Sequence, residues 1–267
     1  MSELVENRGM ESNAGDCVNA VDPIPELDRS DFDRLRHDFT RFMMSYKFGI
    51  DELMTKINVL KEEFTHIHRY SPIEHVGSRL KTPESIITKA RRKNSPLTLD
   101  DIRKNIVDIA GIRITCSFIS DTYRIADMIG SQSDVRILEV KDYIANPKPN
   151  GYKSLHLIVE IPVFMSDRVQ PVPVELQIRT IAMDFWASLE HKIFYKYDGT
   201  IPTPLLAELT EAADSANRLD VTMERLHDEV AEIKSDKSGD AIHLNAMPPM
   251  ALPRELLVAM LERGTTL

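Results

Sequence analysis

The sequence predicts a mixed α/β fold in which helices wrap a β-sheet core. Runs with the period-two alternation that is typical of strands lie at 112–118, 135–142, 154–161 and 172–178. Apolar residues recur at three- and four-residue steps, as on one face of a helix, over 31–68, 180–197 and 204–234. Helices are also expected between several of the strands. The sheet core should therefore carry helical N-terminal and C-terminal extensions.

The chain is expected to divide into five segments: a leader over 1–28, N-terminal helices over 29–69, the core over 70–200, a C-terminal helical extension over 201–235 and a tail over 236–267. The leader is rich in Glu, Asn, Asp and Pro and lacks periodicity, so it should be disordered. The N-terminal segment predicts two helices with a break near Gly49. The tail contains a short amphipathic run, PRELLVAMLERG, which can pack on the core or on another subunit.

Composition narrows the classes of function. A chain of 267 residues can bury a sizeable core in one domain. Its net charge of −9 argues against a protein that binds DNA mainly by electrostatic attraction, although an acidic protein can still contain a local basic cleft. Cys17 and Cys116 are too few and too far apart for a disulfide framework or a C-x-x-C metal site. No apolar stretch approaches the roughly 20 residues that span a bilayer, and the acidic N-terminus lacks the features of a signal peptide. The expected location is the cytoplasm.

The first stretch that can carry chemistry is SRLKTPESIITKARRK, residues 78–93. Thr82 is a good N-cap and Pro83 suits the first helical position, so a helix should begin there. Cationic side chains and one hydroxyl should gather near its N-terminal half: Arg79, Lys81, Ser85, Lys89 and Arg92. Such a cluster suits a polyphosphate. A solvated basic helix explains the same pattern, and the residues alone leave both interpretations open.

The second stretch is DIAGIRI, residues 108–114, where a helix is expected to end at Gly111 and a strand to begin. Mg²⁺ is typically held by one or two carboxylates together with substrate phosphates and water, so Asp108 beside a cationic cleft is a candidate metal ligand. An ordinary residue at a helix end explains Asp108 equally well. Arg113 interrupts an apolar strand, and its planar guanidinium can stack on a base.

The third stretch is the loop NPKPNGYKSLH, residues 146–156. Two prolines stiffen it, Gly151 permits backbone geometries closed to other residues, and the alternation that follows indicates a strand. An exposed Tyr152 ring can stack on a base, while three neighbours can bind phosphates: Lys148, Lys153 and His156. An ordinary hairpin turn is the alternative.

The fourth stretch is VELQIRT, residues 174–180, where the alternation places three polar side chains on one face: Glu175, Gln177 and Arg179. They form either the wall of a site or a solvent-facing sheet edge. The helical run AMDFWASLEHK then follows, and its apolar stripe is expected to lie mostly in the core: Phe185, Leu189 and Ile193. His191 and Lys192 either reach a phosphate or lie on the surface.

In this order, the stretches resemble the synthetase domain of the RelA/SpoT family, and especially its small, single-domain alarmone synthetases, over about residues 70–199. The resemblance implies a nucleotidyltransferase-like mixed sheet and Mg²⁺ as cofactor. It also implies ATP and GDP or GTP as substrates, with transfer of the β,γ-pyrophosphoryl group of ATP to the ribose 3′-OH of the acceptor. The products are guanosine tetraphosphate and pentaphosphate, signals of the stringent response.

The resemblance further implies a role for each residue. Asp108 and Glu175 are expected to bind Mg²⁺, and Glu175 also to act as general base for the 3′-OH. The residues expected around ATP are Arg79 and Arg113 on the adenine and, around the phosphates, Lys81, Ser85, Lys89, Arg92 and the neighbouring Arg91. Those expected around GDP or GTP are Tyr152 on the guanine, Lys148 and His156 on the phosphates, and Gln177 and Arg179 in support.

Other expectations concern activity and assembly. Long relatives degrade alarmones with an H-D-x-x-E-D motif, whereas His227-Asp228 is followed here by EVAE, so synthesis without hydrolysis is expected. Because small members are often homotetramers, a homo-oligomer is expected, with a tetramer favoured. RNA and the alarmone product are candidate effectors, and residues 73–79 are the place to look for such control.

Two alternatives remain. The same fold can pyrophosphorylate another acceptor, such as an adenine nucleotide or the 3′ end of tRNA, in which case the surroundings of Tyr152 should differ. A catalytically silent regulator that binds nucleotides or RNA is the second. The retention of Asp108 and Glu175 argues against it.

Overall fold

The structure, a computed structural model, describes residues 28–67, 70–194 and 202–237. The chain divides into two units, Met1–Phe39 and Thr40–Leu267. Apart from its last residue the expected leader lies outside the described residues, as does the amphipathic run of the tail. None of the helices in the described part of the chain combines the length and the apolar character that a bilayer span requires.

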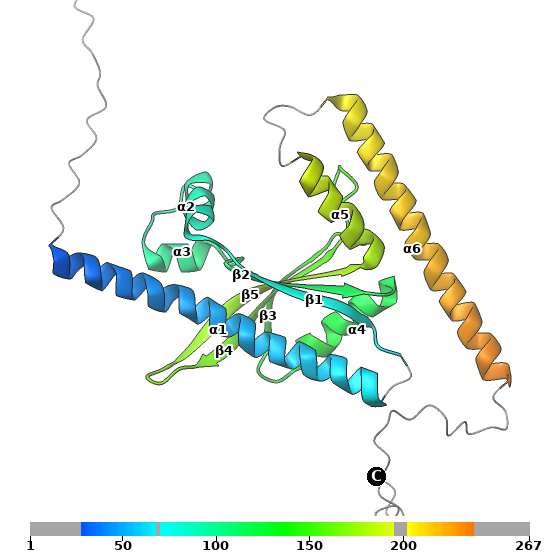
Figure 1. The fold of residues 1–267 in the computed structure, drawn as a ribbon, viewed down its shortest axis with the longest axis horizontal. Coiled ribbons are helices and arrows are strands. Elements are labelled where there is room, and N and C mark those ends of the chain that lie inside the picture. The colour runs from blue at the N-terminus through cyan, green and yellow to red at the C-terminus, as the bar shows by residue number, and fades with distance from the viewer. Residues whose placement is uncertain (1–27, 68–69, 195–201, 238–267) are drawn as a thin grey trace, which may run out of the picture. The chain divides into compact units, whose positions relative to one another are not determined.

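The described elements follow one another in the order α1 (Arg29–Ile67), β1 (Ile73–Leu80), α2 (Pro83–Arg92), α3 (Leu99–Asn105), β2 (Ala110–Cys116), α4 (Ile119–Gly130), β3 (Arg136–Asp142), β4 (Leu155–Phe164), β5 (Val169–Thr180), α5 (Ile181–Phe194) and α6 (Thr203–Lys237). All five strands join one sheet in the order β1-β2-β5-β4-β3 (Figure 1). β2 and β5 run parallel, and every other pair is antiparallel. The predicted class, a mixed sheet with helical regions N-terminal and C-terminal to it in the chain, is confirmed.

The central position of β5 decides between two interpretations of VELQIRT. A strand at a sheet edge has a neighbour on one side only, whereas β5 is hydrogen-bonded to β2 on one side and to β4 on the other. The interpretation as a solvent-facing edge is therefore wrong. The alternation itself is confirmed, since the apolar members of the stretch are fully buried: Val174, Leu176 and Ile178.

Two helices cover the apolar face of the sheet. α1 crosses it at Gly49, where an added Cβ would lie 2.8 Å from Val172 Cγ1 of β5. α4 covers it at Gly130, where an added Cβ would lie 2.6 Å from Ile137 Cδ1 of β3. The prediction of two helices broken near Gly49 is wrong, because α1 is continuous. Glycine costs about 1 kcal/mol in a helix relative to alanine, and here it permits the close approach of helix and sheet.

The four predicted strands are confirmed as β2 to β5, and the predicted helices after residue 82 and on either side of residue 200 as α2, α5 and α6. The sequence does not predict β1. This strand lies at the edge of the sheet, and only Ile73 among its residues is buried. Without an alternation of buried and exposed residues, the pattern that identifies a strand is missing.

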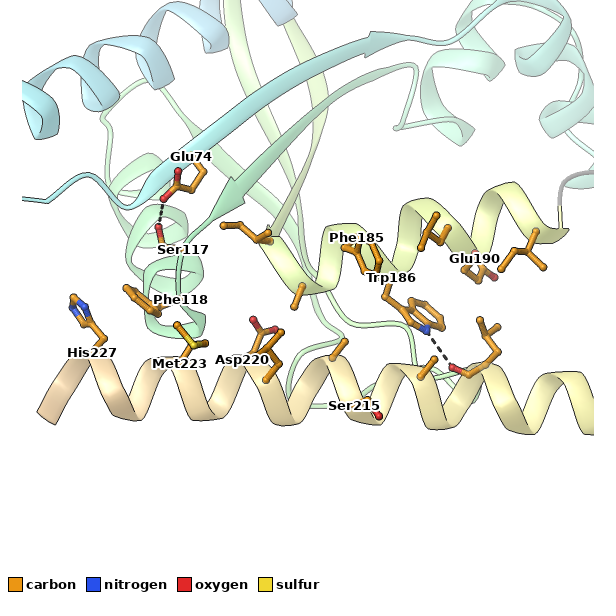
Figure 2. A pocket seen from close by; sticks show the side chains of 18 of the residues that line it. Glu74, Ser117, Phe118, Phe185, Trp186, Glu190, Ser215, Asp220, Met223 and His227 are labelled. Carbon is orange, nitrogen blue, oxygen red and sulfur yellow. Dashed lines mark hydrogen bonds between the residues drawn. The ribbon is translucent and has the colours of Figure 1, made fainter. Parts of the chain in front are cut away.

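α5 and α6 lie side by side with an apolar groove of 1140 Å³ between them (Figure 2). The only tryptophan, Trp186, is buried there and donates from Nε1 to the Leu209 carbonyl at 3.1 Å. The expectation that the stripe of α5 lies in the core is wrong: Phe185 is 66%, Leu189 40% and Ile193 61% exposed. These three side chains line the groove together with Trp186.

Candidate active site

The polar face of the sheet collects most of the predicted site residues. In the strand register, Arg113 of β2 pairs with Gln177 of β5, which pairs with His156 of β4. Two residues along, the next row of this face contains Arg79 of β1 and Glu175 of β5. Side chains two residues apart on a strand point to the same face. The register alone therefore brings together residues from four strands.

A cavity of 220 Å³ opens on this face over β1, β2 and β5. Its walls carry two guanidinium groups, those of Arg79 and Arg113, and its floor contains Gly77 and Gly111. An added Cβ at Gly77 would meet nothing within 4 Å, and one at Gly111 would meet only carbonyl oxygens at 3.8 and 3.9 Å. The two glycines thus keep open a space between the arginines. We call this space the glycine cavity.

A second cavity, of 180 Å³, lies on the same face over β3, β4 and the loop before β4. It is lined by Glu139, Lys141, Tyr143, Lys148, His156, Ile158 and Glu175. We call it the lysine cavity. Glu175 lines both cavities, so groups bound in the two spaces meet at this carboxylate.

Asp108 lies in the turn that joins α3 to β2. The prediction that a helix ends at Gly111 is wrong, because that glycine lies inside β2, and the backbone leaves the helical region already at Ile106, with φ −122° and ψ 89°. Lys81 Nζ donates to Asp108 Oδ2 at 3.0 Å, and Lys89 Nζ donates to the same oxygen. Two predicted phosphate binders therefore converge on the predicted metal ligand.

The two carboxylate oxygens of Asp108 have different surroundings. Burial would raise the pKa of Asp108, but the hydrogen bonds and charges of Lys89 and Lys81 outweigh it and hold the pKa below its ordinary value of 3.8. The carboxylate is therefore ionised at neutral pH. Its other oxygen, Oδ1, is buried and has no hydrogen-bond partner among the described residues. Such an atom is costly unless another group binds it.

Glu175 is held by two neighbours. Its Oε1 lies 3.5 Å from His156 Nδ1, and its Oε2 accepts a hydrogen bond from Gln177 Nε2 at 2.9 Å. Burial would raise the pKa of Glu175, but His156 and Gln177 outweigh burial, and the pKa is lowered from 4.5 even though the charge of Asp108 opposes this. Asp108 and Glu175 thus influence each other electrostatically.

Asp108 and Glu175 suit a magnesium ion. Mg²⁺ takes oxygen ligands and is usually bound by one or two carboxylates, with phosphates and water completing its shell. The partnerless Oδ1 of Asp108 is the atom that a cation would satisfy. Over the described ranges, no group of three or more His, Cys, Asp and Glu side chains is placed to hold a metal ion. Substrate oxygens would therefore have to contribute to the site.

The loop before β4 is fixed on the surface of α6. Gly151 has φ +85°, a value that favours glycine, and an added Cβ there would lie 2.4 Å from Ala213 Cβ. Lys153, a predicted phosphate binder, instead donates from Nζ to Asn217 Oδ1 of α6 at 2.5 Å. The loop is therefore more than a hairpin turn, because helix contacts fix its position.

Tyr152 is half-buried rather than exposed and packs against the buried cluster of Trp186, Ala187 and Ala213. Its hydroxyl accepts a hydrogen bond from Arg179 Nη2 at 2.6 Å and lies 2.8 Å from His156 Nε2. Lys148 Nζ lies 4.7 Å from the centre of the tyrosine ring. The predicted acceptor residues are thus in mutual contact, and the hydroxyl holds them together.

Neither cavity is lined by Asp108, Lys81, Tyr152 or Arg179, nor by the predicted residues of α2 and α5. Ser85 bonds to Thr82: its backbone N donates to Thr82 Oγ1 at 3.3 Å, which confirms the predicted N-cap, and its Oγ accepts from the same hydroxyl at 3.0 Å. Arg91 and Arg92 are exposed on α2, and Lys192 is exposed on α5. Gln177, expected on the acceptor side, lines the glycine cavity.

Residues of this region that were not predicted from the sequence include Gly77, Gly111, Lys141 and Asp184. For the glycines a signal exists, because each stands two residues before an arginine in its strand, as Gly-Ser-Arg and Gly-Ile-Arg. Glycine inside a strand often marks a place where another group approaches closely. For Asp184, which contacts Arg113 and Arg179, no sequence signal exists, since its partners lie on two other elements.

The chain is similar to known proteins in sequence. A family model described as "Region found in RelA / SpoT proteins" matches residues 78–200. The GTP pyrophosphokinase YwaC of Bacillus subtilis is 49% identical over 200 residues, which make up 75% of this chain and 95% of that protein. The likeness therefore spans nearly the whole relative rather than a single motif.

The fold is also that of solved structures. The small alarmone synthetase 1 of B. subtilis bound to its product pppGpp superposes with a TM-score of 0.67 at 38% identity, covering 72% of this chain and 98% of that one. The same synthetase bound to AMPCPP gives a TM-score of 0.63 at 37% identity, covering 73% and 99%.

Proposed function

Because the chain belongs to the RelA/SpoT family, we propose that it synthesises guanosine tetraphosphate and pentaphosphate. In this reaction the 3′-oxygen of GDP or GTP attacks the β-phosphorus of ATP, the bond from that phosphorus to the α,β-bridging oxygen breaks, and AMP leaves. The observation that carries the proposal is Glu175, one carboxylate on two cavities of the same sheet face. A transfer between two nucleotides needs such a junction.

The glycine cavity is the proposed site of the adenine of ATP. Guanidinium planes stack well on aromatic rings, and Arg79 and Arg113 stand on either side of a floor without side chains. The phosphates would then extend toward Lys81 and Lys89, which neutralise Asp108 in the structure described here. The remaining proposed phosphate binders also belong to α2: Ser85, Arg91 and Arg92.

The lysine cavity is the proposed site of GDP or GTP. Tyr152 is assigned to the guanine, and Lys148 and His156 to the acceptor phosphates, with Gln177 and Arg179 in supporting contacts. Lys141 of β3 is an additional cation on the wall of this cavity. In the structure described here Lys141 Nζ lies 2.9 Å from Glu139 Oε1, so an acceptor phosphate would compete with this carboxylate for the lysine.

Asp108 and Glu175 are assigned to Mg²⁺, which would supply neutralisation of the charge that builds up on the transferred phosphates. The lowered pKa of each carboxylate keeps it ionised, as metal binding requires. Glu175 also orients the 3′-OH and accepts its proton. Because its pKa is low, it is a weak base. Proton transfer should therefore come late, when the forming bond to phosphorus has made the hydroxyl acidic.

The proposal is tested by incubating the purified protein with ATP and, separately, GDP, GTP, GMP, ADP and tRNA, and separating the products by anion exchange. The expected result is a guanosine product with two additional phosphates and an equal amount of AMP. Pyrophosphorylated ADP or tRNA instead would support the alternative acceptors. Nucleotide binding without any product would support the silent regulator. Glu175→Gln should retain the fold and lose turnover.

We also propose a homo-oligomer, with a tetramer favoured. On the C-terminal half of α6, exposed apolar side chains recur at steps of four and three residues: Leu219, Met223, Leu226, Val230 and Ile233. That spacing is the seam of a coiled coil. Toward the N-terminus the same stripe continues through Ala216 and Leu209, which pack against Trp186. A second copy fits the exposed half, because in a twofold interface the same patch faces itself.

Three expectations accompany this proposal. The location is the cytoplasm, where both nucleotide substrates are available. RNA and the alarmone product stay candidate effectors, with β1 as the place to look. Hydrolysis of the product is not expected, and His227, the first residue of the incomplete motif, lies against Phe118 with ring centres 4.3 Å apart and ring planes tilted by 33°.

A further inference from the structure

Asp184 joins the two nucleotide sites proposed above. It lies in the first turn of α5, and one oxygen of its carboxylate, Oδ1, is 3.3 Å from Arg113 Nη1 and 3.2 Å from Arg179 Nη1. Arg113 belongs to the glycine cavity. Arg179 holds the hydroxyl of Tyr152. A single carboxylate oxygen thus contacts the arginine of one site and the arginine that supports the other.

Arg179 is suited to transmit position rather than to bind a substrate. It is only 4% exposed, and each edge of its guanidinium group is engaged. Nε donates to Ser154 Oγ at 3.3 Å, while Nη2 donates to the Tyr152 hydroxyl at 2.6 Å and to Gln177 Oε1 at 2.9 Å. With Nη1 on Asp184, the group has little freedom to rotate.

The contacts of Arg179 close into a ring on the sheet face. Tyr152 contacts His156, His156 contacts Glu175, Glu175 accepts from Gln177, and Gln177 accepts from Arg179. The ring includes the aromatic side chain proposed for guanine and the carboxylate proposed for catalysis. Asp184 is the connection from this ring to Arg113.

Arg113 has the opposite character. Its side chain is 46% exposed, and it forms an ion pair with Asp184. An ion pair at one terminal nitrogen fixes the edge of the guanidinium group and leaves its planar faces available for stacking. Without the carboxylate, the two guanidinium groups would stand close together with no anion between them, and the exposed one, that of Arg113, would turn away.

We propose that Asp184 is a positioning residue that couples the binding of ATP to the binding of the guanine nucleotide. The inference rests on the proposed function. Stacking of adenine fixes Arg113, Arg113 fixes Asp184, and Asp184 fixes Arg179 and with it the Tyr152 ring. Each nucleotide therefore prepares the site of the other. By linkage, the factor by which ATP raises the affinity for GDP equals the factor by which GDP raises the affinity for ATP.

A purely local role makes a different prediction. An acidic residue in the first turn stabilises a helix through the positive end of its dipole. If that were all, replacing Asp184 would lower thermal stability and change both affinities without changing the factor that links them. The linkage factor is therefore the decisive quantity.

The test uses the full chain and AMPCPP, in which a methylene group replaces the α,β-bridging oxygen, so the bond that the reaction breaks is absent. Calorimetry gives the affinity for GDP with and without saturating AMPCPP. In the wild-type protein the affinity should rise by a factor of about 5–150, the usual range of such coupling. In Asp184→Ala the factor should fall to about one. Asp127→Ala, which removes an exposed carboxylate from α4, is the matched control and should keep the wild-type factor.

Asp184→Asn keeps an oxygen acceptor and removes the charge, so it is the second test variant and replaces Asp184→Ala if that variant does not fold. Its factor should lie between those of wild type and alanine. A wild-type factor of one, or a factor that is unchanged in both Asp184 variants, would overturn the inference. Failure of the proposed function looks different: the wild-type protein would then bind neither nucleotide or make no alarmone from ATP and GDP.

Discussion

Gly111 of β2 is the register partner of Glu175 of β5, so the carboxylate that both cavities share stands beside a position without a side chain. The added Cβ of an alanine at Gly111 would make only ordinary contacts. Backbone geometry therefore does not require glycine there. The space itself is the feature that the sequence provides.

Gly111→Val tests that space. The new side chain should fill part of the 220 Å³ cavity and raise the KM for ATP about tenfold, a loss of about 1.4 kcal/mol, with little change in the KM for GDP. The melting temperature should shift by less than about 4 °C. Steady-state kinetics with each nucleotide varied in turn measures both constants. Equal increases in the two constants would contradict the assignment of the cavity to ATP.

Asp108→Asn should reduce synthesis by at least about 100-fold, the scale for removing one charge-stabilising group from an active site. It should also lower thermal stability at neutral pH, because Lys81 and Lys89 lose their counter-charge. The folded pKa of Asp108 is lowered, so its stabilising contribution is present above the ordinary pKa of 3.8 and is lost as the pH falls through the folded pKa. The difference in melting temperature from wild type should thus be constant near pH 7 and shrink below about pH 4.

The matched control for Asp108 is Asp100→Asn, which changes a highly exposed acid on α3. That variant should retain synthesis and melt like the wild type at each pH. Comparable losses in the two variants would mean that the effect comes from net charge and not from the position of Asp108.

Two variants of Tyr152 separate its ring from its hydroxyl. Tyr152→Ala should weaken GDP binding by roughly 1–3 kcal/mol, the scale for stacking of a base on an aromatic ring. Tyr152→Phe keeps the ring but removes the acceptor of Arg179 and the partner of His156, so it should lose about 1 kcal/mol, as for one hydrogen bond. Calorimetric titration with GDP measures both. GDP binding that is unaffected in Tyr152→Ala would show that the ring is structural and that the acceptor site lies elsewhere.

Gly151→Ala should destabilise the protein by about 1–3 kcal/mol, because the residue has a positive φ and its new methyl group would collide with Ala213. Thermal unfolding gives the size of the effect. Gly77→Ala is the control, since a methyl group there meets nothing within 4 Å. If both variants melted at the same temperature, the loop would not be fixed by α6 as described.

Leu226→Glu combined with Val230→Glu places two charges on the exposed stripe of α6. If this stripe is the seam between copies, light scattering after gel filtration should show a smaller species than for the wild type, because unpaired charges are costly in an apolar interface. Val59→Glu, at a more exposed apolar position of α1, is the control and should leave the assembly unchanged. An identical mass for all three proteins would show that the stripe is not part of an interface between copies.

Local signals in the sequence were sufficient for much of this architecture. Thr82 and Pro83 marked the start of α2, and strict alternation marked β5, because both patterns depend on neighbours along the chain. Gly49 was misread because its partner, Val172, is distant in sequence. The exposure of Phe185 could not be predicted either, since periodicity identifies an apolar face but not what covers it.

The same distinction applies to the site. Arg79, Arg113 and Glu175 were predicted by residue type and by resemblance, and the strand register brings them to one face. The bridge through Asp184 depends on how α5 leaves the end of β5, which no local pattern specifies. Contacts between side chains on separate elements are the part of the site that required the structure.

The parallel pairing of β2 with β5 has a consequence for how the protein is made. β2 is synthesised well before β5, because α4, β3 and β4 lie between them in the chain. The glycine cavity is therefore incomplete until β5 pairs with β2. Pairings between strands far apart in sequence form slowly, because closing the long loop between them lowers the chain entropy before any stabilising contact forms. A ribosome-bound nascent chain that ends before β5 therefore has neither Glu175 nor a completed sheet. The protein cannot begin to consume ATP until its central strand has emerged and been inserted between its two neighbours.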